Sequence, residues 1–259
     1  KRRNLFHGEQ ILMPHFVIDW GLHALLKFTF DYETNTVLDI GSGLGEHKRF
    51  MEYFDKKVYS VDMTAKADYF GDFLNVKIDN QFDAIWCSHV LEHQRNVGAF
   101  LDKIYLALKL GGVLAIVVPT HSRDKLIPGH ITSWSIPLLC YNLVLAGFDC
   151  SQASILKTYE LSLIMKKNDA PHFERGKNSI YGMEIAGYKK IKREEMNPFE
   201  HIESYFPFPA KPGSSVSGHG QINWGNFLRY FVRTNKEIPT FESKNINIYP
   251  DFLPKIDRH

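Results

Sequence analysis

The stretch VLDIGSGLGEHKRF, residues 37–50, constrains the fold of this chain more than any other segment. An apolar run carries Asp39 near its end, and Gly41, Gly43 and Gly45 then follow at every second position. A helical pattern begins directly after them. Loops of this kind hold an anionic or nucleotide-bearing ligand against backbone N–H groups at the start of a helix. The stretch therefore predicts an α/β fold with such a ligand at this loop.

Strand and helix signals alternate over residues 36–167, which predicts a mostly parallel sheet covered on both faces. Residues 1–35 carry apolar side chains at helical spacing, and we expect one or two helices there, formed around Ile11, Leu12, Phe16, Leu22, Leu25 and Leu26. Residues 168–259 lose the alternation. The chain is thus divided into an N-terminal helical cap, an α/β core and a loop-rich C-terminal extension.

Within the core we expect helices over residues 44–54, from Asn96 to a stop at Gly111-Gly112, and over residues 133–146. The expected strands are TVLDI, KVYSVD, FDAIWC and VLAIVVP. The segments CSQASILK and YELSLIMKK predict an antiparallel hairpin that closes the sheet. That hairpin separates the fold from the all-parallel dinucleotide-binding sheet, and argues against a dehydrogenase.

The composition is that of an ordinary folded protein, with 44% hydrophobic and 23% charged residues and a formal net charge of +2. This balance gives no electrostatic indication of a nucleic-acid partner. Cys87, Cys140 and Cys150 show no metal-binding spacing, so we expect reduced structural thiols and no metal site. We find no membrane-spanning segment or signal-peptide pattern and expect a cytoplasmic protein.

Acidic residues near the glycine loop indicate which class of ligand the loop binds. Gly41 and Gly43 fit the dinucleotide fingerprint, but its third glycine is replaced by Glu46. Asp62 ends the second predicted strand, where a carboxylate can accept hydrogen bonds from ribose hydroxyls. No G-K-[ST] follows the loop, which excludes a P-loop. We therefore expect a nucleoside-bearing ligand.

Four blocks, VLDIGSGLG, VYSVDM, FDAIWCSHVLEH and LALKLGGVLAIVVP, resemble in order and spacing the class I S-adenosylmethionine-dependent methyltransferases, in particular a small-molecule branch with a SHVLEH-type turn. The resemblance covers residues 36–167, about half the chain. It implies a Rossmann-like, seven-stranded, mostly parallel sheet with an antiparallel closing hairpin, and S-adenosyl-L-methionine as the cofactor.

The same resemblance implies roles for individual residues in cofactor binding. Asp39 would face the methionine amino group, and Asp62 would hold the ribose hydroxyls. The backbone of the loop would approach the amino-acid part and the adenosine at Gly41, Ser42, Gly43 and Gly45.

On the adenine side, Met63 would lie against the ring, and Asp72 would accept from its exocyclic amine. Phe73 would donate its backbone N–H to the same ring edge. Ser88 and His89 would border the reactive methyl group.

Methylation of a hydroxyl or amide needs a proton acceptor, and histidine suits that role near neutral pH. We rank His130, before the last core helix, first as base or substrate ligand, and His121, directly after a strand, second. His89 borders the methyl group, whereas we interpret His93 as a structural residue bonded within its turn. The alternative is that His130 or His121 only caps a turn.

The acceptor is the least determined part of the site. The sequence CSHV replaces the Pro-Pro-aromatic tetrapeptide of base N-methylases, and Cys87 lies within a strand, which disfavours C5-cytosine methylation. The C-terminal stretch GSSVSGHGQINWGN, with His219 and Trp224, suits a phosphate or sugar hydroxyl, as part of an acceptor lid or dimer arm. The alternative is a surface loop packed on the core.

We therefore expect methyl transfer to a hydroxyl of a small polar acceptor, such as a sugar or cell-surface glycan precursor with or without a phosphate. Methylation of a small amine or amide is the second hypothesis. A non-catalytic cofactor-binding or assembly module is a third hypothesis, and an RNA methyltransferase is a fourth. We expect no nucleic-acid partner.

Overall fold

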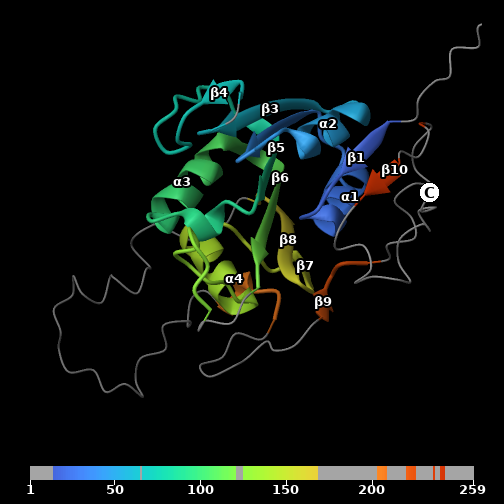
Figure 1. Cartoon of the computed structure of the whole chain (residues 1–259). Coiled ribbons are helices and arrows are strands. Elements are labelled where there is room, and N and C mark those ends of the chain that lie inside the picture. Colours follow the sequence, from blue (N-terminus) through green and yellow to red (C-terminus); the bar gives the residue numbers. More distant parts are fainter. Residues whose placement is uncertain are drawn as a thin grey trace, which may run out of the picture.

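The computed structural model describes residues 14–64, 66–120, 125–168, 203–208, 220–225, 236 and 240–242. Figure 1 shows the arrangement of their helices and strands. In chain order these elements are β1 (His15–Val17), α1 (Leu22–Asp31), β2 (Thr36–Ile40), α2 (Glu46–Tyr53), β3 (Lys57–Asp62), β4 (Tyr69–Phe70), β5 (Phe82–Ser88), the 3-10 turn η1 (Leu91–His93), α3 (Val97–Ala107), β6 (Leu108–Pro119), α4 (Ile136–Leu145), β7 (Ser154–Lys157), β8 (Glu160–Lys166), the 3-10 turn η3 (Glu203–Tyr205), β9 (Gly220–Ile222) and β10 (Thr240–Glu242).

The main sheet of the described residues has eight strands in the order β4-β3-β2-β5-β6-β8-β7-β9. The strands β4, β3, β2, β5 and β6 run parallel, and β8, β7 and β9 are antiparallel to their neighbours. The prediction of a mostly parallel sheet closed by a hairpin is confirmed. The sheet has one strand more than the expected seven because β9, from the C-terminal region, pairs with β7.

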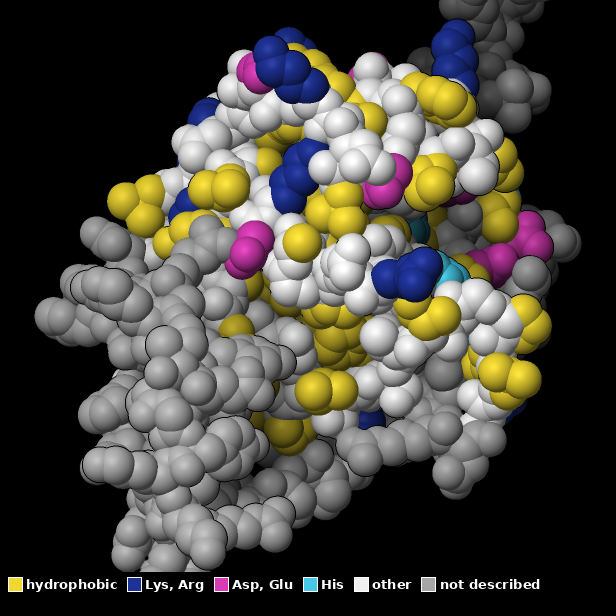
Figure 2. All heavy atoms as spheres, turned by 90° about the vertical axis from the view of Figure 1, so that its left-hand side faces the viewer, with side chains coloured by type: hydrophobic (Ala, Val, Ile, Leu, Met, Phe, Trp, Pro, Cys, Tyr) yellow, Lys and Arg dark blue, Asp and Glu magenta, His cyan; other side chains and the backbone are white. Residues whose placement is uncertain are grey.

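Side chains alternate between the two faces of this sheet, as the geometry of a strand requires. Along β5, Ala84 and Trp86 join one buried cluster, whereas Ile85 and Cys87 join the other. Helices α1 and α2 lie on the first face, and α3 and α4 on the second (Figure 1). Among the described residues visible on the side of α3 and α4, basic and acidic side chains are scattered between hydrophobic ones (Figure 2).

The N-terminal segment differs from the expectation of helices alone. Its described part holds one helix, α1, and a short strand, β1, so that Phe16 lies in a strand rather than a helix. Strand β1 pairs in parallel with β10, and the Ile18 N–H donates to the Glu242 carbonyl at 2.8 Å. A partner strand from far along the chain therefore overrides the helical spacing of the apolar residues.

Helix boundaries were predicted less well than helix positions. The helix α3 ends at Ala107, not at Gly111-Gly112, because β6 begins at Leu108 and runs through both glycines. Helix α4 ends as expected before Gly147, whose φ of 101° and N–H bond to the Val144 carbonyl at 2.9 Å form a Schellman cap. It begins at Ile136, later than the expected residue 133.

The described pieces of the C-terminal region pack on the core. Trp224 is 1% exposed and joins the cluster that carries α1, with the Lys27 ammonium 5.5 Å from its ring centre. The pairing of β9 with β7 thus carries Trp224 into the core, which fits the alternative of a loop packed on the core at this residue. His219 lies outside the described residues. The three cysteines are free and buried, as predicted.

No helix in the described ranges is both long and apolar enough to cross a bilayer.

Candidate active site

The glycine loop lies at the carboxyl end of β2 and is bound to the neighbouring end of β3. The N–H groups of Gly41 and Ser42 donate to the Val61 carbonyl at 2.8 and 3.2 Å, and the Gly43 N–H donates to Asp62 Oδ2 at 2.8 Å. The loop glycines have φ values of 74°, 52° and 81° at residues 41, 43 and 45. Such values favour glycine, which explains why the sequence repeats it here.

The surroundings of these glycines show on which side the loop is open. A Cβ atom added at Gly43 or Gly45 would meet no protein atom within 4 Å, whereas one at Gly41 would lie 2.2 Å from Val90 Cγ2. Gly41 therefore packs against the protein, and Gly43 and Gly45 offer bare backbone to a ligand. This cradle fits the amino-acid and sugar parts of a nucleoside cofactor.

Asp39, in β2 directly before the loop, is the buried charge of the site. The residue is 1% exposed, and its Oδ2 atom has no hydrogen-bond partner among the described residues. Burial raises the pKa of this carboxyl to about 7, against the lowering effect of the Lys48 charge and with a further raising effect of Asp62. A buried acceptor without a partner fits a cationic ammonium group of the ligand.

Asp62 shapes the loop from the end of β3. Its Oδ2 atom accepts from the Gly43 N–H, and its Oδ1 atom accepts from the Thr64 N–H at 2.7 Å and hydroxyl at 3.0 Å. Its backbone carbonyl accepts from the Gly71 N–H at 2.8 Å, which places the loop carrying Asp72 beside it. The two carboxylates expected at the ribose and adenine thus lie on adjoining strand ends.

The adenine-side residues have different environments. Asp72 accepts from the Leu74 N–H and the Asn75 amide, both at 3.0 Å, and Met63 is exposed. The Phe73 ring is buried against Phe100, with ring centres 5.0 Å apart, so that only its backbone is placed to bind a ligand. A hollow of about 500 Å³ is lined here by Tyr69, Phe70, Gly71, Asp72, Asn75, Val76 and Lys77. No regular helix is formed by the described residues between Asp62 and Asp72.

His89 follows β5 directly and is held in place from several sides. Its N–H donates to the Val117 carbonyl at 2.8 Å, and its φ of 55° turns the chain out of the strand. Its Nδ1 atom lies 3.2 Å from the Ser88 hydroxyl, and its Nε2 atom lies 3.7 Å from Glu160 Oε2. His89 thus lies between its sequence neighbour Ser88 and a buried carboxylate, Glu160.

Glu160 is a functional candidate that the sequence reasoning missed. It is 1% exposed and its two oxygens accept from the Gly21 N–H at 3.1 and 3.0 Å. Burial raises its pKa to about 7, opposed by the hydrogen bonds from Gly21 and Tyr159. Glu160 opens β8 opposite Pro119, so the antiparallel register carries it to the carboxyl edge of the sheet. An acidic residue at the start of an otherwise apolar strand was the available signal.

Trp20 covers His89 and was also missed. Its ring centre lies 5.1 Å from that of His89 and 6.0 Å from that of Tyr159, and 49% of the residue is exposed. Its carbonyl accepts from His47 Nε2 at 3.0 Å, while His47 Nδ1 accepts from the Trp86 indole at 3.0 Å. These bonds hold Trp20 beside the end of β5 and leave one exposed aromatic face there.

The other histidines are placed elsewhere on this edge. His130 lies before α4, as expected, but its ring packs against His93, with ring centres 4.9 Å apart. His93 Nδ1 bonds the Gly129 carbonyl at 2.8 Å, so His93 is tied to the loop before α4 rather than only within its own turn. His121 lies outside the described residues.

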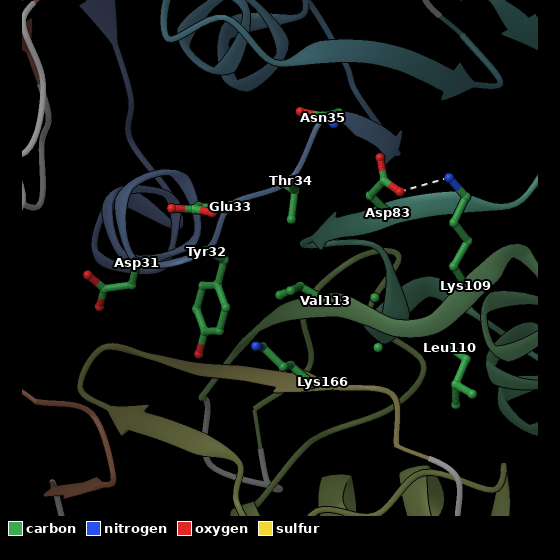
Figure 3. A pocket seen from close by; sticks show the side chains of 12 residues that line it. Asp31, Tyr32, Glu33, Thr34, Asn35, Asp83, Lys109, Leu110, Val113 and Lys166 are labelled. Carbon is green, nitrogen blue, oxygen red and sulfur yellow. Dashed lines mark hydrogen bonds and ion pairs between the residues drawn. The ribbon is translucent and has the colours of Figure 1, made fainter.

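A cavity of about 570 Å³ lies at the opposite, amino-terminal edge of the sheet, between the end of α1 and the starts of β5 and β6 (Figure 3). Its charged lining includes an ion pair between Asp83 and Lys109 at 2.7 Å. Ligands of open α/β sheets bind at the carboxyl ends of the strands, so this cavity does not belong to the glycine-loop site.

A family model described as "Methyltransferase domain" matches residues 13–149, which is more than half of the chain. The chain belongs to this methyltransferase family. Its strand order and closing hairpin are those of the class I fold expected from the sequence. A methyltransferase domain fits the expected cofactor, S-adenosylmethionine.

Solved methyltransferase structures are similar to this methyltransferase at low sequence identity. One is 1,6-didemethyltoxoflavin-N1-methyltransferase from Burkholderia thailandensis, which is 18% identical over 57% of this chain and 76% of that chain, with a TM-score of 0.49. A second is an S-adenosylmethionine-dependent methyltransferase from Aquifex aeolicus, which is 20% identical over 56% of this chain and 88% of that chain, with a TM-score of 0.45. A third, from Archaeoglobus fulgidus, is 17% identical over 56% of this chain and 93% of that chain, with a TM-score of 0.45. A comparison with curated proteins finds no match.

The raised pKa of Asp39 predicts a pH-dependent cofactor affinity in this methyltransferase. Only the ionised carboxylate attracts the cofactor's ammonium group, so binding of S-adenosylhomocysteine is expected to strengthen about tenfold from about pH 6 to about pH 7.5. Titration calorimetry at several pH values measures this. Asp39→Asn should bind more weakly and lose the dependence. The same pH dependence in Asp39→Asn would contradict the assignment.

Proposed function

We propose that the chain transfers the methyl group of S-adenosylmethionine to a hydroxyl of a small polar acceptor, such as a sugar or cell-surface glycan precursor with or without a phosphate. The contact of His89 Nε2 with Glu160 Oε2 at 3.7 Å carries the proposal. A hydroxyl must lose a proton as it is methylated, whereas a neutral amine can attack without a base. A histidine–carboxylate pair beside the expected methyl position therefore favours a hydroxyl.

The residues expected to hold the cofactor are those of the glycine loop and the acids around it. Asp39 would bind its ammonium group, the backbone at Gly43 and Gly45 would lie along it, and Asp62 would hold the ribose. Met63, Asp72 and the Phe73 N–H would contact the adenine, and Ser88 would border the methyl group. When bound, the cofactor supplies an electrophilic methyl on a positively charged sulfur.

His89 is the proposed proton acceptor for the attacking hydroxyl, and the proton goes to Nδ1, because Nε2 is buried and faces Glu160. Glu160 stabilises the imidazolium that forms, because its carboxylate is buried at 3.7 Å from Nε2 and water screens it little. Trp20 shields one side of the imidazole and offers an exposed aromatic face to the acceptor. Apolar faces with a few placed polar groups are typical of small-molecule sites. The proposal ranks His89 above His130, which faces His93 instead.

An acceptor panel tests the proposal. The full chain is incubated with methyl-labelled S-adenosylmethionine and sugars, sugar phosphates, small amines or RNA, and the product atom is identified by mass spectrometry. Transfer to a sugar hydroxyl supports the proposal. Transfer only to amines, or salt-sensitive transfer to RNA, contradicts it. Asp62→Ala serves as the cofactor-binding control and should lower product formation for every acceptor alike.

A further inference from the structure

Glu92, His93 and His130 form a cluster that the proposed methyl transfer does not use. Glu92 and His93 belong to η1, and His130 belongs to the loop before α4. One carboxylate oxygen and one ring nitrogen of each histidine all lie within 4.8 Å of one another. The two halves of the cluster come from segments far apart in sequence, so only the fold brings them together.

The Glu92 carboxylate lies in this cluster without a hydrogen-bond partner among the described residues. The residue is fully buried, at 0% exposure, and neither carboxylate oxygen accepts a hydrogen bond of normal geometry from another described residue. Its Oε1 atom lies 3.8 Å from His93 Nε2, which is too long for a hydrogen bond. A buried carboxylate without partners is costly, and a bound cation would remove that cost.

The tautomer of His93 strengthens the argument. Its Nδ1 atom lies 2.8 Å from the Gly129 carbonyl, which can only accept, so Nδ1 carries the proton. In the neutral ring Nε2 therefore presents a lone pair, and this lone pair faces the Glu92 carboxylate. Two acceptors that face each other are stabilised by a positive charge between them, either a proton or a metal ion. Metal-binding histidines typically donate their other ring N–H to a backbone carbonyl in this way.

The loop that supplies His130 is fixed on η1 by backbone contacts. The N–H groups of Ile131 and Thr132 donate to the Glu92 carbonyl at 3.0 and 3.2 Å. Gly129 has a φ of 83°, and a Cβ there would lie 3.4 Å from His93 Nδ1, so a glycine lets the loop approach the imidazole. The three candidate ligands are thus held together before any ion binds.

We propose that Glu92, His93 and His130 bind one divalent transition-metal ion of the zinc type. Two imidazoles and one carboxylate favour such an ion over Mg²⁺ or Ca²⁺, which prefer oxygen ligands. Metal–ligand distances of about 2.0–2.2 Å place two ligand atoms roughly 3.4 Å apart in a tetrahedral site, close to the 3.8 Å between His93 Nε2 and Glu92 Oε1. Small rotations of the His130 ring complete the site. The fourth position is open to water or to an acceptor oxygen.

Metal content tests the proposal without an activity assay. The full chain is treated with a chelator, loaded with Co²⁺, and examined for bound metal by mass spectrometry and for tetrahedral Co²⁺ absorption in the visible range. We expect His130→Asn and Glu92→Gln each to bind one equivalent less than the unmodified chain and to lose the absorption band. Zn²⁺ should displace the Co²⁺ band with near-stoichiometric competition.

His15→Asn is the matched control, because His15 is partly exposed and lies outside the cluster. It should keep the full metal content and the band. Equal metal loss in His15→Asn and His130→Asn would overturn the proposal, as would a chain that shows no tetrahedral Co²⁺ band. Because His130 lies in a loop, the His130→Asn variant should bind S-adenosylhomocysteine as the unmodified chain does. This separates failure of the metal site from misfolding and from failure of the methyl-transfer proposal.

Discussion

His89→Asn is expected to lower the methyl-transfer turnover by about 10²–10⁴-fold, the range typical of a lost general base. Asparagine tolerates the left-handed backbone that the φ of 55° imposes, so the fold should persist. The side chain of asparagine cannot accept the hydroxyl proton near neutral pH. Turnover is measured with the acceptor that the panel identifies, and cofactor affinity by calorimetry should change little. A turnover within about twofold of the unmodified chain would remove His89 from the mechanism.

The variant Glu160→Gln tests the role of the Glu160 carboxylate separately from that of the His89 imidazole. Gln keeps an oxygen for the Gly21 N–H but carries no charge, so turnover should fall less than in His89→Asn. The groups that face Glu160 are His89, Tyr159 and the Gly21 N–H. Because the pKa of Glu160 is raised to about 7, turnover of the unmodified chain should rise as pH increases through that value. That rise should be weaker in Glu160→Gln.

Glu160→Gln should lower turnover but should not lower the free energy of unfolding. A carboxyl whose pKa is raised by folding stabilises the native state at low pH and loses that contribution as pH rises through about 7. Glutamine avoids the buried charge, so the variant should unfold no more easily than the unmodified chain at about pH 8. A loss of turnover together with unchanged stability therefore points to chemistry rather than to damage of the fold.

Gly41→Ala is expected to have the largest effect on cofactor binding. The added Cβ would lie 2.2 Å from Val90 Cγ2, and alanine at a φ of 74° is strained. Strain of about 1–2 kcal/mol and overpacking of about 1–3 kcal/mol should together lower the free energy of unfolding by roughly 2–5 kcal/mol. The loop should also shift from its bonds to Val61, which weakens S-adenosylhomocysteine binding. Denaturant unfolding and calorimetry measure the two effects.

Two matched variants check this reasoning. Gly43→Ala has similar backbone strain but no protein atom within 4 Å of the new Cβ, so it should lose less stability than Gly41→Ala. Truncating the neighbour in Gly41→Ala/Val90→Ala removes the contacting methyl group and should recover part of the cofactor affinity. Equal destabilisation by Gly41→Ala and Gly43→Ala would contradict the packing argument.

Local features of the chain were predictable because each depends on residues close together in sequence. Alternating strand and helix signals, the glycine loop and the closing hairpin all appear in the structure where the sequence placed them. Asp39 and Asp62 were found because a parallel sheet puts the ends of β2 and β3 side by side. The error at Phe16 arose where β10, a strand from the C-terminal region, pairs with the distant strand β1.

The sequence by itself thus determined the methyltransferase core and its glycine loop, since strand periodicity and the left-handed glycines are local properties of the backbone. Only the tertiary structure decided which groups surround His89 and His130. Glu160 reaches the Gly21 N–H across 139 residues and lies beside His89 because β8 runs antiparallel to β6. His130 meets His93 rather than an open cleft because the loop before α4 binds η1. Such contacts depend on strand register and loop docking, which no local pattern specifies.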